Sequence, residues 1–313
     1  MSKINNYIEY INNSIETDPT EFINECEYRY RNIIASIAKR INEDKNIEIV
    51  FLAGPSSSGK TTTSRLLADG LDVLGRKTHT VSLDDFYKNR DDIEFDENGK
   101  QDFECLEALD LPLINKTIVN ILNRTNTDLP IYNFNTGKRE EETWKLRLEK
   151  GDIVVFEGLH ALNPVILNLI PKRNRLSLFV NVSSRIYDKK MNIILNKRNI
   201  RFIRRVIRDY QYRSSSVEKT YSMWQQVRAG EKKYLFPFKD NADINVNSTH
   251  LYEISVYKNT IMKLLNEITP ESEFYSDAHK LANSVKMFKP IPVQAVPANS
   301  LLNEFIFKNS LKS

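Results

Sequence analysis

The stretch Gly54-Pro55-Ser56-Ser57-Ser58-Gly59-Lys60-Thr61 decides the fold of this 313-residue chain. It has a glycine, four further residues and then Gly-Lys-Thr, a spacing that wraps backbone N–H groups around a phosphate chain. The apolar run at 47–53 predicts a buried strand before this phosphate loop, and residues 62–67 begin a helix after it. A helix N-terminus and loop amides together attract an anion. We therefore expect a bound nucleoside triphosphate, and not a chance glycine turn, with Lys60 on the β- and γ-phosphates and Thr61 on Mg²⁺.

Short apolar strands alternate with amphipathic helices along the rest of the chain. Further strands are predicted at 78–83, 152–156, 176–182 and, more weakly, 243–246. Helices are predicted at 19–41, 111–122, 184–195, 200–212 and 217–228, and a turn is predicted at Asn98-Gly99. This alternation is typical of an α/β fold of the P-loop NTPase type, in which helices cover both faces of a parallel sheet.

The pattern divides the chain into three parts. Residues 1–44 are expected to form an N-terminal helical segment, and 45–270 the main domain. Residues 271–313 form a C-terminal tail, in which three prolines precede a short apolar helix predicted at 301–307. We expect this helical tail to pack on the main domain, with binding to a partner as the alternative.

Composition excludes several classes of protein. The 45 basic and 41 acidic residues leave a net charge of only +4, so nucleic-acid binding across the whole surface is not expected. Cys26 and Cys105 lack metal-ligand spacing and fit a reducing compartment. The N-terminus lacks the features of a signal peptide, and no apolar run approaches the roughly 18 residues that span a bilayer. We expect a cytoplasmic protein without membrane contact.

Two carboxylates follow predicted strands directly. Asp84 could orient an acceptor hydroxyl and take its proton, or it could cap the next segment. Glu157 ends the strand at 152–156, where P-loop proteins often hold Mg²⁺; a structural ion pair is the alternative. Because ligands bind at the carboxyl ends of parallel strands, both acids and the phosphate loop should meet at one edge of the sheet.

Four arginines share one face of the helix predicted at 200–212. They are Arg201, Arg204, Arg205 and Arg208, and their spacing of three, four and seven places them on the side opposite apolar residues. Arginines without lysine favour bidentate recognition of phosphate. We expect a lid at about 197–232 that closes over the transferring phosphoryl group, and RNA binding is the competing interpretation.

With these residues in place, the chain resembles the uridine kinase and phosphoribulokinase group of P-loop kinases over roughly 45–250. The motifs that carry the resemblance are Leu83-Asp84-Asp85-Phe86-Tyr87, residues 102–110, 129–134 and 138–140, Phe156-Glu157-Gly158-Leu159-His160 and residues 204–209. The chain is most similar to a bacterial uridine kinase-like branch often found behind a small TGS-type domain, for which the segment before the phosphate loop is too short.

The motif and the resemblance together imply a set of site residues. The expected catalytic residues are Lys60, Asp84, Arg205 and Arg208. The expected ATP site comprises Gly54, Pro55, Ser56, Ser57, Ser58, Gly59, Lys60, Thr61, Thr62 and Arg204. The expected acceptor site comprises Asp84, Glu104 on the ribose, Tyr132 in a hairpin beside the base, Arg205 and Arg213. Mg²⁺ is expected on Thr61 and Glu157.

Two positions depart from the group's pattern. The hairpin reads Asn135-Thr136-Gly137 where better-known uridine-cytidine kinases have a histidine, and Met223 stands where they have a glutamine. We expect an ATP- and Mg²⁺-dependent kinase acting on the 5′-hydroxyl of a nucleoside, uridine or cytidine first. The alternatives are a kinase for another small hydroxyl acceptor, such as a sugar phosphate or a pantothenate-like acid, and a nucleotide-binding regulatory or RNA-associated protein. A homo-oligomer is possible.

Overall fold

A five-stranded parallel sheet forms the centre of the computed structural model, which describes residues 6–94, 101–134 and 136–306. The strand order is β11-β8-β1-β7-β2, so the strand that enters the phosphate loop lies in the middle. The strands are β1 (Ile49–Ala53), β2 (Thr78–Ser82), β7 (Ile153–Glu157), β8 (Arg175–Asn181) and β11 (Ile244–Asn247). Each predicted strand is confirmed in type; β1, β7 and β8 are buried almost throughout, as a covered parallel sheet requires, and the more polar β2 and β11 lie at its edges.

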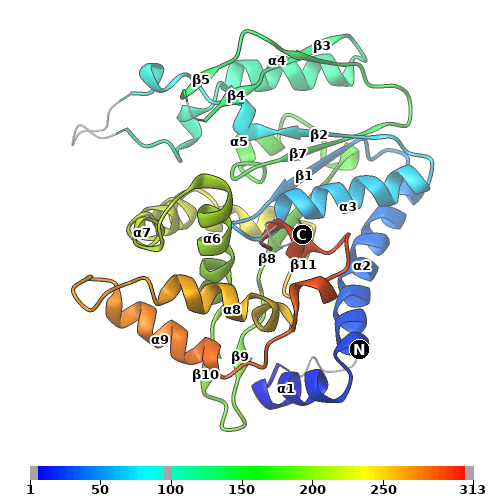
Figure 1. Ribbon diagram of the computed structural model, residues 1–313. Helices are drawn as coiled ribbons and strands as arrows, with labels where there is room; N and C mark the ends of the chain where they lie inside the picture. The colour runs from blue at the N-terminus through cyan, green and yellow to red at the C-terminus, as the bar shows by residue number, and fades with distance from the viewer. Residues whose placement is uncertain (1–5, 95–100, 135, 307–313) are drawn as a thin grey trace.

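Alternate residues of β1 belong to two separate cores. Val50 and Leu52 contribute to one, and Ile49 and Phe51 to the other. The first core is covered by helices near both ends of the chain (Figure 1): α1 (Ile8–Thr17), α2 (Pro19–Glu43), α3 (Lys60–Val73), α6 (Lys197–Arg213), α8 (Glu253–Leu265) and α9 (Tyr275–Lys286). These helices cover one face of the sheet, as the expected α/β fold requires.

The second core is covered by shorter elements inserted between β2 and β8. They are α4 (Leu111–Leu122), α5 (Pro164–Leu167), β3 (Thr127–Leu129), β4 (Tyr132–Asn133), β5 (Lys138–Arg139) and β6 (Trp144–Leu146). Two antiparallel pairs, β3 with β6 and β4 with β5, form the predicted hairpin region. The predicted turn at Asn98-Gly99 lies outside the described residues.

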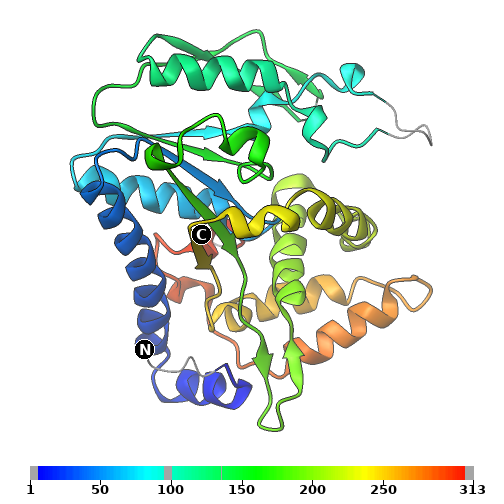
Figure 2. The same ribbon diagram turned by 180° about the vertical axis from the view of Figure 1, so that it is seen from behind.

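The helix predicted at 184–195 is wrong, because this segment is an antiparallel hairpin. Its strands are β9 (Ile186–Tyr187) and β10 (Ile193–Leu195), and the hairpin extends away from the sheet (Figure 2). Asp188 Oδ1 accepts hydrogen bonds from the N–H groups of Lys190 and Asn192, each at 2.8 Å, and Met191 has a φ of 65°. A side chain that bonds the following backbone favours a turn over a helix, and this local bonding prevails over the apolar spacing.

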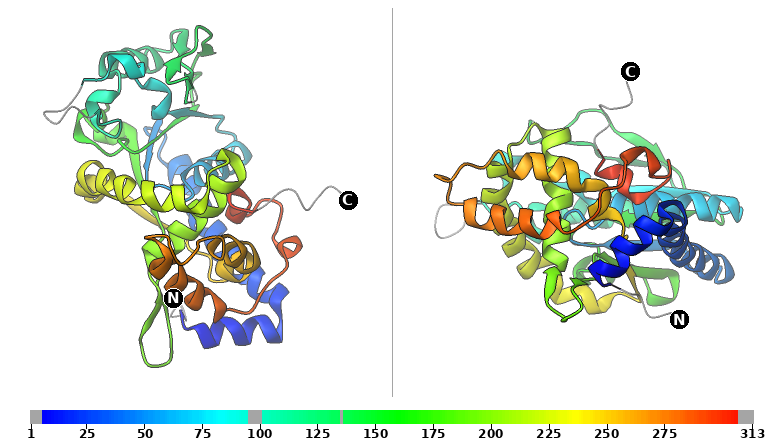
Figure 3. Two further views of the ribbon diagram at one scale, coloured as in Figure 1. Left: turned by 60° about the vertical axis from the view of Figure 1, so that its left-hand side comes forward. Right: turned by 60° about the horizontal axis from the view of Figure 1, so that its bottom comes forward.

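Helix α7 (Val217–Tyr234) and the tail complete the molecule. Helices α2, α4, α6 and α7 confirm the other helix predictions, although α7 continues six residues beyond the predicted end at 228. The tail ends in a 3-10 helix, η7 (Leu301–Glu304), which lies beside α3 and α6 (Figures 1 and 3). Phe307, the end of the helix predicted there, lies outside the described residues. No helix in the described parts of the chain combines the length and apolar character needed to cross a membrane.

Candidate active site

The phosphate loop connects β1 to α3 in a conformation that its glycines permit. Gly59 has a φ of +88°, a value that favours glycine, and it directly precedes the first residue of α3. A Cβ on Gly54 would lie 2.2 Å from the carbonyl oxygen of Val180 on β8. Both glycines of the motif are therefore required by geometry, one by its backbone angle and the other by a close approach.

Polar groups of the phosphate loop are left available for a ligand. The hydroxyls of Ser57 and Ser58 are buried and have no hydrogen-bond partner within the described residues. Lys60 Nζ donates to the carbonyl oxygen of Gly54 at 3.0 Å, and Thr61 is exposed at the N-terminus of α3. Buried hydroxyls without partners cost free energy unless a ligand satisfies them, so the loop fits a phosphate chain.

Asp84 and Glu157 lie next to this loop, at the carboxyl ends of β2 and β7. Glu157 pairs in register with Ser82, the last residue of β2, and Asp84 is the second residue of the following 3-10 turn, η1 (Leu83–Phe86). Burial raises the pKa of both carboxyls, to about 7 for Glu157, whereas the charge of Lys60 lowers both pKa values. The predicted convergence of acids and phosphate loop at one sheet edge thus appears in the electrostatics of the site.

Glu104 lies on the far side of Asp84, in the segment that precedes α4. Burial and the charge of Asp84 raise the pKa of the Glu104 carboxyl. Its backbone carbonyl accepts a hydrogen bond from His160 Nε2 at 3.0 Å, and a Cβ on Gly230 of α7 would lie 3.1 Å from its Cβ. Asp102 accepts a hydrogen bond from Tyr234, which ties this segment to the end of α7. Glu104 is therefore held between the lid and the sheet edge.

Three aromatic side chains form a cluster beside these acids. The ring centroids of Tyr87 and Tyr132 are 5.6 Å apart, and those of Tyr132 and Phe134 are 5.0 Å apart. The charges of Asp84 and Glu104 help burial to raise the pKa of Tyr87, which places Tyr87 near both acids. Phe134 is more than half exposed. The rings are tilted or edge-to-face to one another, so this aromatic wall offers apolar ring faces and edges next to the carboxylates, which a planar base could contact.

The departure at Gly137 has a structural cause. Gly137 has a φ of +71°, and a Cβ there would lie 2.4 Å from Cδ of Arg90. Arg90 Nη2 donates to the carbonyl oxygen of Phe134 at 2.9 Å, so the guanidinium crosses the hairpin at this point. Met223 on α7 is partly exposed, and Asn135 lies outside the described residues.

The four arginines of α6 divide into two pairs. Arg205 Nη1 donates to the hydroxyl of Ser56 at 2.8 Å, and Arg208 Nη2 to the same oxygen at 3.4 Å. Burial lowers the pKa of Arg208 to about 10, and nearby Arg213 adds to this effect. Arg205 and Arg208 therefore converge on the hydroxyl of Ser56 in the phosphate loop.

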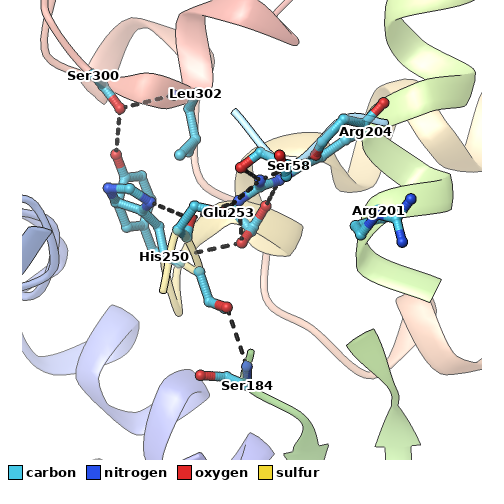
Figure 4. Close-up of polar contacts among 12 residues, drawn as sticks. Ser58, Ser184, Arg201, Arg204, His250, Glu253, Ser300 and Leu302 are labelled. Atoms are coloured by element: carbon cyan, nitrogen blue, oxygen red, sulfur yellow. Dashed lines mark hydrogen bonds and ion pairs between the residues drawn. The ribbon is translucent and has the colours of Figure 1, made fainter. Parts of the chain in front are cut away.

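Arg201 and Arg204 instead hold the backbone of the loop. Arg201 Nε donates to the carbonyl oxygen of Ser56 at 2.9 Å and is paired with Glu231. Arg204 is fully buried and pairs with Glu253 on α8, 2.6 Å from its Nε (Figure 4). Its other donors reach Ser248 and the carbonyl oxygens of Ser57 and Ser58. These contacts favour a role for Arg204 as a support for the loop.

Arg213 and Thr62 lie together in a pocket at the start of α3, away from the contact of Arg205 with Ser56. Arg213 was expected at the acceptor and Thr62 at ATP, but both line one pocket of about 500 Å³ beside α3. Arg213 is 54% exposed and its Nη1 lies 3.2 Å from Asp209 Oδ1. The structure thus places Arg213 in the same pocket as Thr62, at the start of α3.

Several residues of the site were not anticipated. Glu231 accepts a hydrogen bond from the backbone N–H of Ser56 at 2.8 Å, and Glu253 neutralises Arg204. Tyr87 and Phe134 complete the aromatic wall. Tyr87 and Phe134 both lie within motifs that carry the family resemblance, whereas Glu253 carries no sequence signal, since its partner Arg204 is 49 residues away.

A magnesium ion fits the donors present. No group of three or more His, Cys, Asp or Glu side chains in the described ranges could hold a metal by itself. Mg²⁺ is usually bound through one or two carboxylates together with substrate phosphates. The exposed hydroxyl of Thr61 and the carboxylate of Glu157 provide that kind of incomplete site next to the loop.

Comparisons with known proteins agree with this geometry. The model of the phosphoribulokinase / uridine kinase family matches residues 49–255, more than half of the chain. A uridine kinase from Lactobacillus johnsonii is 29% identical over 207 residues, which cover 65% of this chain and 88% of that protein. One from Lactobacillus helveticus is 28% identical, over 63% of this chain and 85% of that protein.

The fold is also similar to a solved structure described as a possible uridine kinase from Bacillus stearothermophilus. The match covers 70% of this chain and 98% of the chain in that structure. Its TM-score is 0.45 at 18% identity, which carries no conclusion about function. The family match spans the phosphate loop, both strand-end acids and the arginines of α6. We conclude that this chain belongs to the phosphoribulokinase / uridine kinase family and is a phosphotransferase.

Proposed function

We propose that this enzyme transfers the γ-phosphoryl group of ATP, with Mg²⁺, to the 5′-hydroxyl of a nucleoside, with uridine or cytidine as the first candidate. The observation that carries the proposal is the position of Asp84. Asp84 lies in the turn that follows β2, and its charge interacts with Lys60 of the phosphate loop as well as with Glu104 and Tyr87. A base near both a phosphate-binding lysine and an acid beside an aromatic wall suits transfer between a triphosphate and a nucleoside.

The reaction would use this chain's residues in a fixed order along the cleft. Asp84 accepts the proton of the acceptor hydroxyl while the oxygen of that hydroxyl bonds to the γ-phosphorus. The bond between the γ-phosphorus and the bridging oxygen of the β-phosphate breaks at the same time, and ADP leaves. Lys60, Arg205 and Arg208 stabilise the negative charge on the transferring group. The raised pKa of Asp84 makes its carboxylate a stronger base than an exposed aspartate. Thr61 and Glu157 would hold the magnesium ion, which neutralises phosphate charge when bound.

The acceptor side supports a sugar-bearing, flat substrate. Glu104 would accept hydrogen bonds from ribose hydroxyls, and the rings of Tyr132 and Phe134 would contact the base. Buried hydrogen-bonding groups of this kind can discriminate strongly between acceptors.

Arg90 motivates a second candidate. Its guanidinium crosses the hairpin at Gly137, beside the aromatic wall. A cation there also suits an acceptor with a carboxylate or phosphate, such as a sugar phosphate or a pantothenate-like acid.

A panel of acceptors separates the two candidates. ADP release is measured with ATP and Mg²⁺ in the presence of uridine, cytidine, purine nucleosides, ribose phosphates and pantothenate. The first proposal predicts the highest kcat/KM for a pyrimidine nucleoside. A sugar phosphate or pantothenate as the best substrate would favour the second.

Cytoplasmic location and a homo-oligomeric state stay predictions. Cys26 and Cys105 are both free thiols, which is consistent with a reducing compartment.

A further inference from the structure

The C-terminal tail contacts the phosphate loop directly. Leu301 is fully buried, and its Cδ1 lies 2.5 Å from the place of a Cβ on Gly59. One turn later, Glu304 Oε2 accepts a hydrogen bond from the hydroxyl of Thr62 at 2.9 Å. The matched family region ends at residue 255, so this contact is made by a part of the chain outside that region.

Several contacts hold the tail in place. Leu301, Leu302 and Phe305 are fully buried in the core shared with α2, α3 and α8. The hydroxyl of Ser300 donates to Glu27 on α2. Its oxygen also accepts a hydrogen bond from the backbone N–H of Leu302 (Figure 4). These contacts pack the tail into the core beside the site, so we treat it as a fixed part of the fold and not as a segment that moves during turnover.

The guanidinium of Arg204 joins this wall to the lid helix. It lies over the ring of Phe305, with 5.2 Å between the guanidinium carbon and the ring centroid. Gln211 on α6 donates to the carbonyl oxygen of Ile306 at 2.6 Å. The tail is therefore anchored to α6 as well as to α2, on both sides of Glu304.

The tail, the start of α3 and the end of α6 line an open pocket of about 500 Å³. Its lining includes Thr62, Arg65, Tyr212, Arg213, Asn303 and Glu304. Basic groups, a phenol, an amide and one carboxylate make up the lining, which is the mixture that a phosphorylated sugar with an attached ring would contact. The volume lies in the range typical of small-molecule sites.

The direction of a bound triphosphate follows from the two ends of the phosphate loop. Asp84 and Arg205 mark the end where the γ-phosphate is transferred, since Arg205 reaches Ser56. Thr62 lies at the opposite end, two residues into α3. Arg208 connects the two ends, because it reaches Ser56 and also lines the pocket that contains Thr62. The ribose and base of the donor would extend beyond Thr62, into the pocket that the tail lines.

We propose that the tail forms the wall of the donor-nucleotide pocket and that Glu304 binds a ribose hydroxyl of ATP. This inference rests on the proposed function, because it assumes a nucleoside triphosphate in the phosphate loop. Among the described residues, Glu304 is the one carboxylate that lines the pocket, and carboxylates bind sugar hydroxyls through charge-assisted hydrogen bonds. In the unliganded protein, Thr62 donates to the same carboxylate.

The test compares ligands that differ only in the groups Glu304 would contact. Binding of Mg-ADP, Mg-2′,3′-dideoxy-ADP and inorganic tripolyphosphate is measured by calorimetry for the wild type and for Glu304→Ala. We expect the substitution to weaken ADP by at least about tenfold, the value of a hydrogen bond to a charged group. Dideoxy-ADP and tripolyphosphate should keep their affinity or bind slightly more tightly, because a negative charge has been removed.

Two further variants control this experiment. Glu304→Gln retains the size and one acceptor oxygen and should give an intermediate loss for ADP alone. Glu267→Ala removes an exposed glutamate near the end of α8 and should change none of the three affinities. Thermal unfolding shows whether each variant is folded.

The possible outcomes distinguish a failure of the ribose contact from a failure of the proposed function. Unchanged ADP binding by Glu304→Ala would overturn the ribose contact. Equal tightening of ADP and tripolyphosphate would also overturn it, because that result would show that Glu304 competes with phosphate for the loop. If the wild type binds neither ADP nor tripolyphosphate, the proposed function itself fails.

Discussion

Three buried carboxylates lie near the phosphate loop and the arginines of α6, and their burial raises their pKa values. Asp84, Glu104 and Glu157 all have raised pKa values, in each case mainly through desolvation. Lys60 counteracts this for Asp84 and Glu157, and Arg205 does so for Glu104. Protonation of these groups should therefore occur closer to neutral pH than in exposed carboxylates.

Asp84→Asn tests the base. The carboxamide keeps the shape but cannot accept the proton, so we expect kcat to fall by about 10²- to 10⁴-fold. Binding of ATP, measured by calorimetry, should be nearly unchanged. Asp69→Asn, on the exposed side of α3, is the matched control and should retain activity. Full activity of Asp84→Asn would remove Asp84 from this role.

Glu157 links the metal site to stability. Its pKa is raised from 4.5 to about 7, so the folded protein binds this proton more tightly than the unfolded chain does. The favourable contribution is complete below pH 4.5 and is lost as pH rises through 7. Glu157→Gln should therefore raise the free energy of unfolding at pH 8, by at most about 3 kcal/mol, and have little effect at pH 4.5.

Denaturant unfolding of the metal-free protein at the two pH values measures this difference. The same variant should need more Mg²⁺ for half-maximal activity. An equal change in stability at both pH values would show that the carboxyl titrates normally.

At the scale of elements, one helix face performs two tasks. The spacing of arginines on α6 predicts their common face, but the carboxylates that pair with Arg201 and Arg204 come from α7 and α8, whereas Arg205 and Arg208 pair with Asp209 of α6 itself. Glu231 and Glu253 bury Arg201 and Arg204 as ion pairs, and Arg205 and Arg208 remain directed at Ser56. Spacing along one helix cannot separate these pairs, because the difference arises from side chains brought together by tertiary packing.

Glu253→Gln tests the supporting pair. Removing the charge leaves the guanidinium of Arg204 buried without a counterion, which typically costs about 3–5 kcal/mol. We expect a loss of this size in chemical denaturation. Glu218→Gln, at an exposed position in the first turn of α7, should be nearly neutral. A small loss for Glu253→Gln would mean that the pair is not required to hold the loop.

At the scale of the whole molecule, the sequence predicts what depends on short-range patterns. The phosphate loop, the five parallel strands and the two strand-end acids follow from apolar runs and from motif spacing. The segment 184–195 was misassigned because Asp188 stabilises a turn within an apolar pattern that also fits a helix. The contact between Glu304 and Thr62 joins residues 242 positions apart, and no local pattern indicates it.

The most direct test of the central proposal uses acceptors that differ by one oxygen. ADP release from ATP and Mg²⁺ is measured with uridine and with 5′-deoxyuridine, which keeps the base and the other ribose hydroxyls. Transfer to the 5′-hydroxyl predicts that uridine increases the rate well above that of ATP alone and that 5′-deoxyuridine does not. Equal stimulation by both nucleosides, or none by any nucleoside tested, would contradict it.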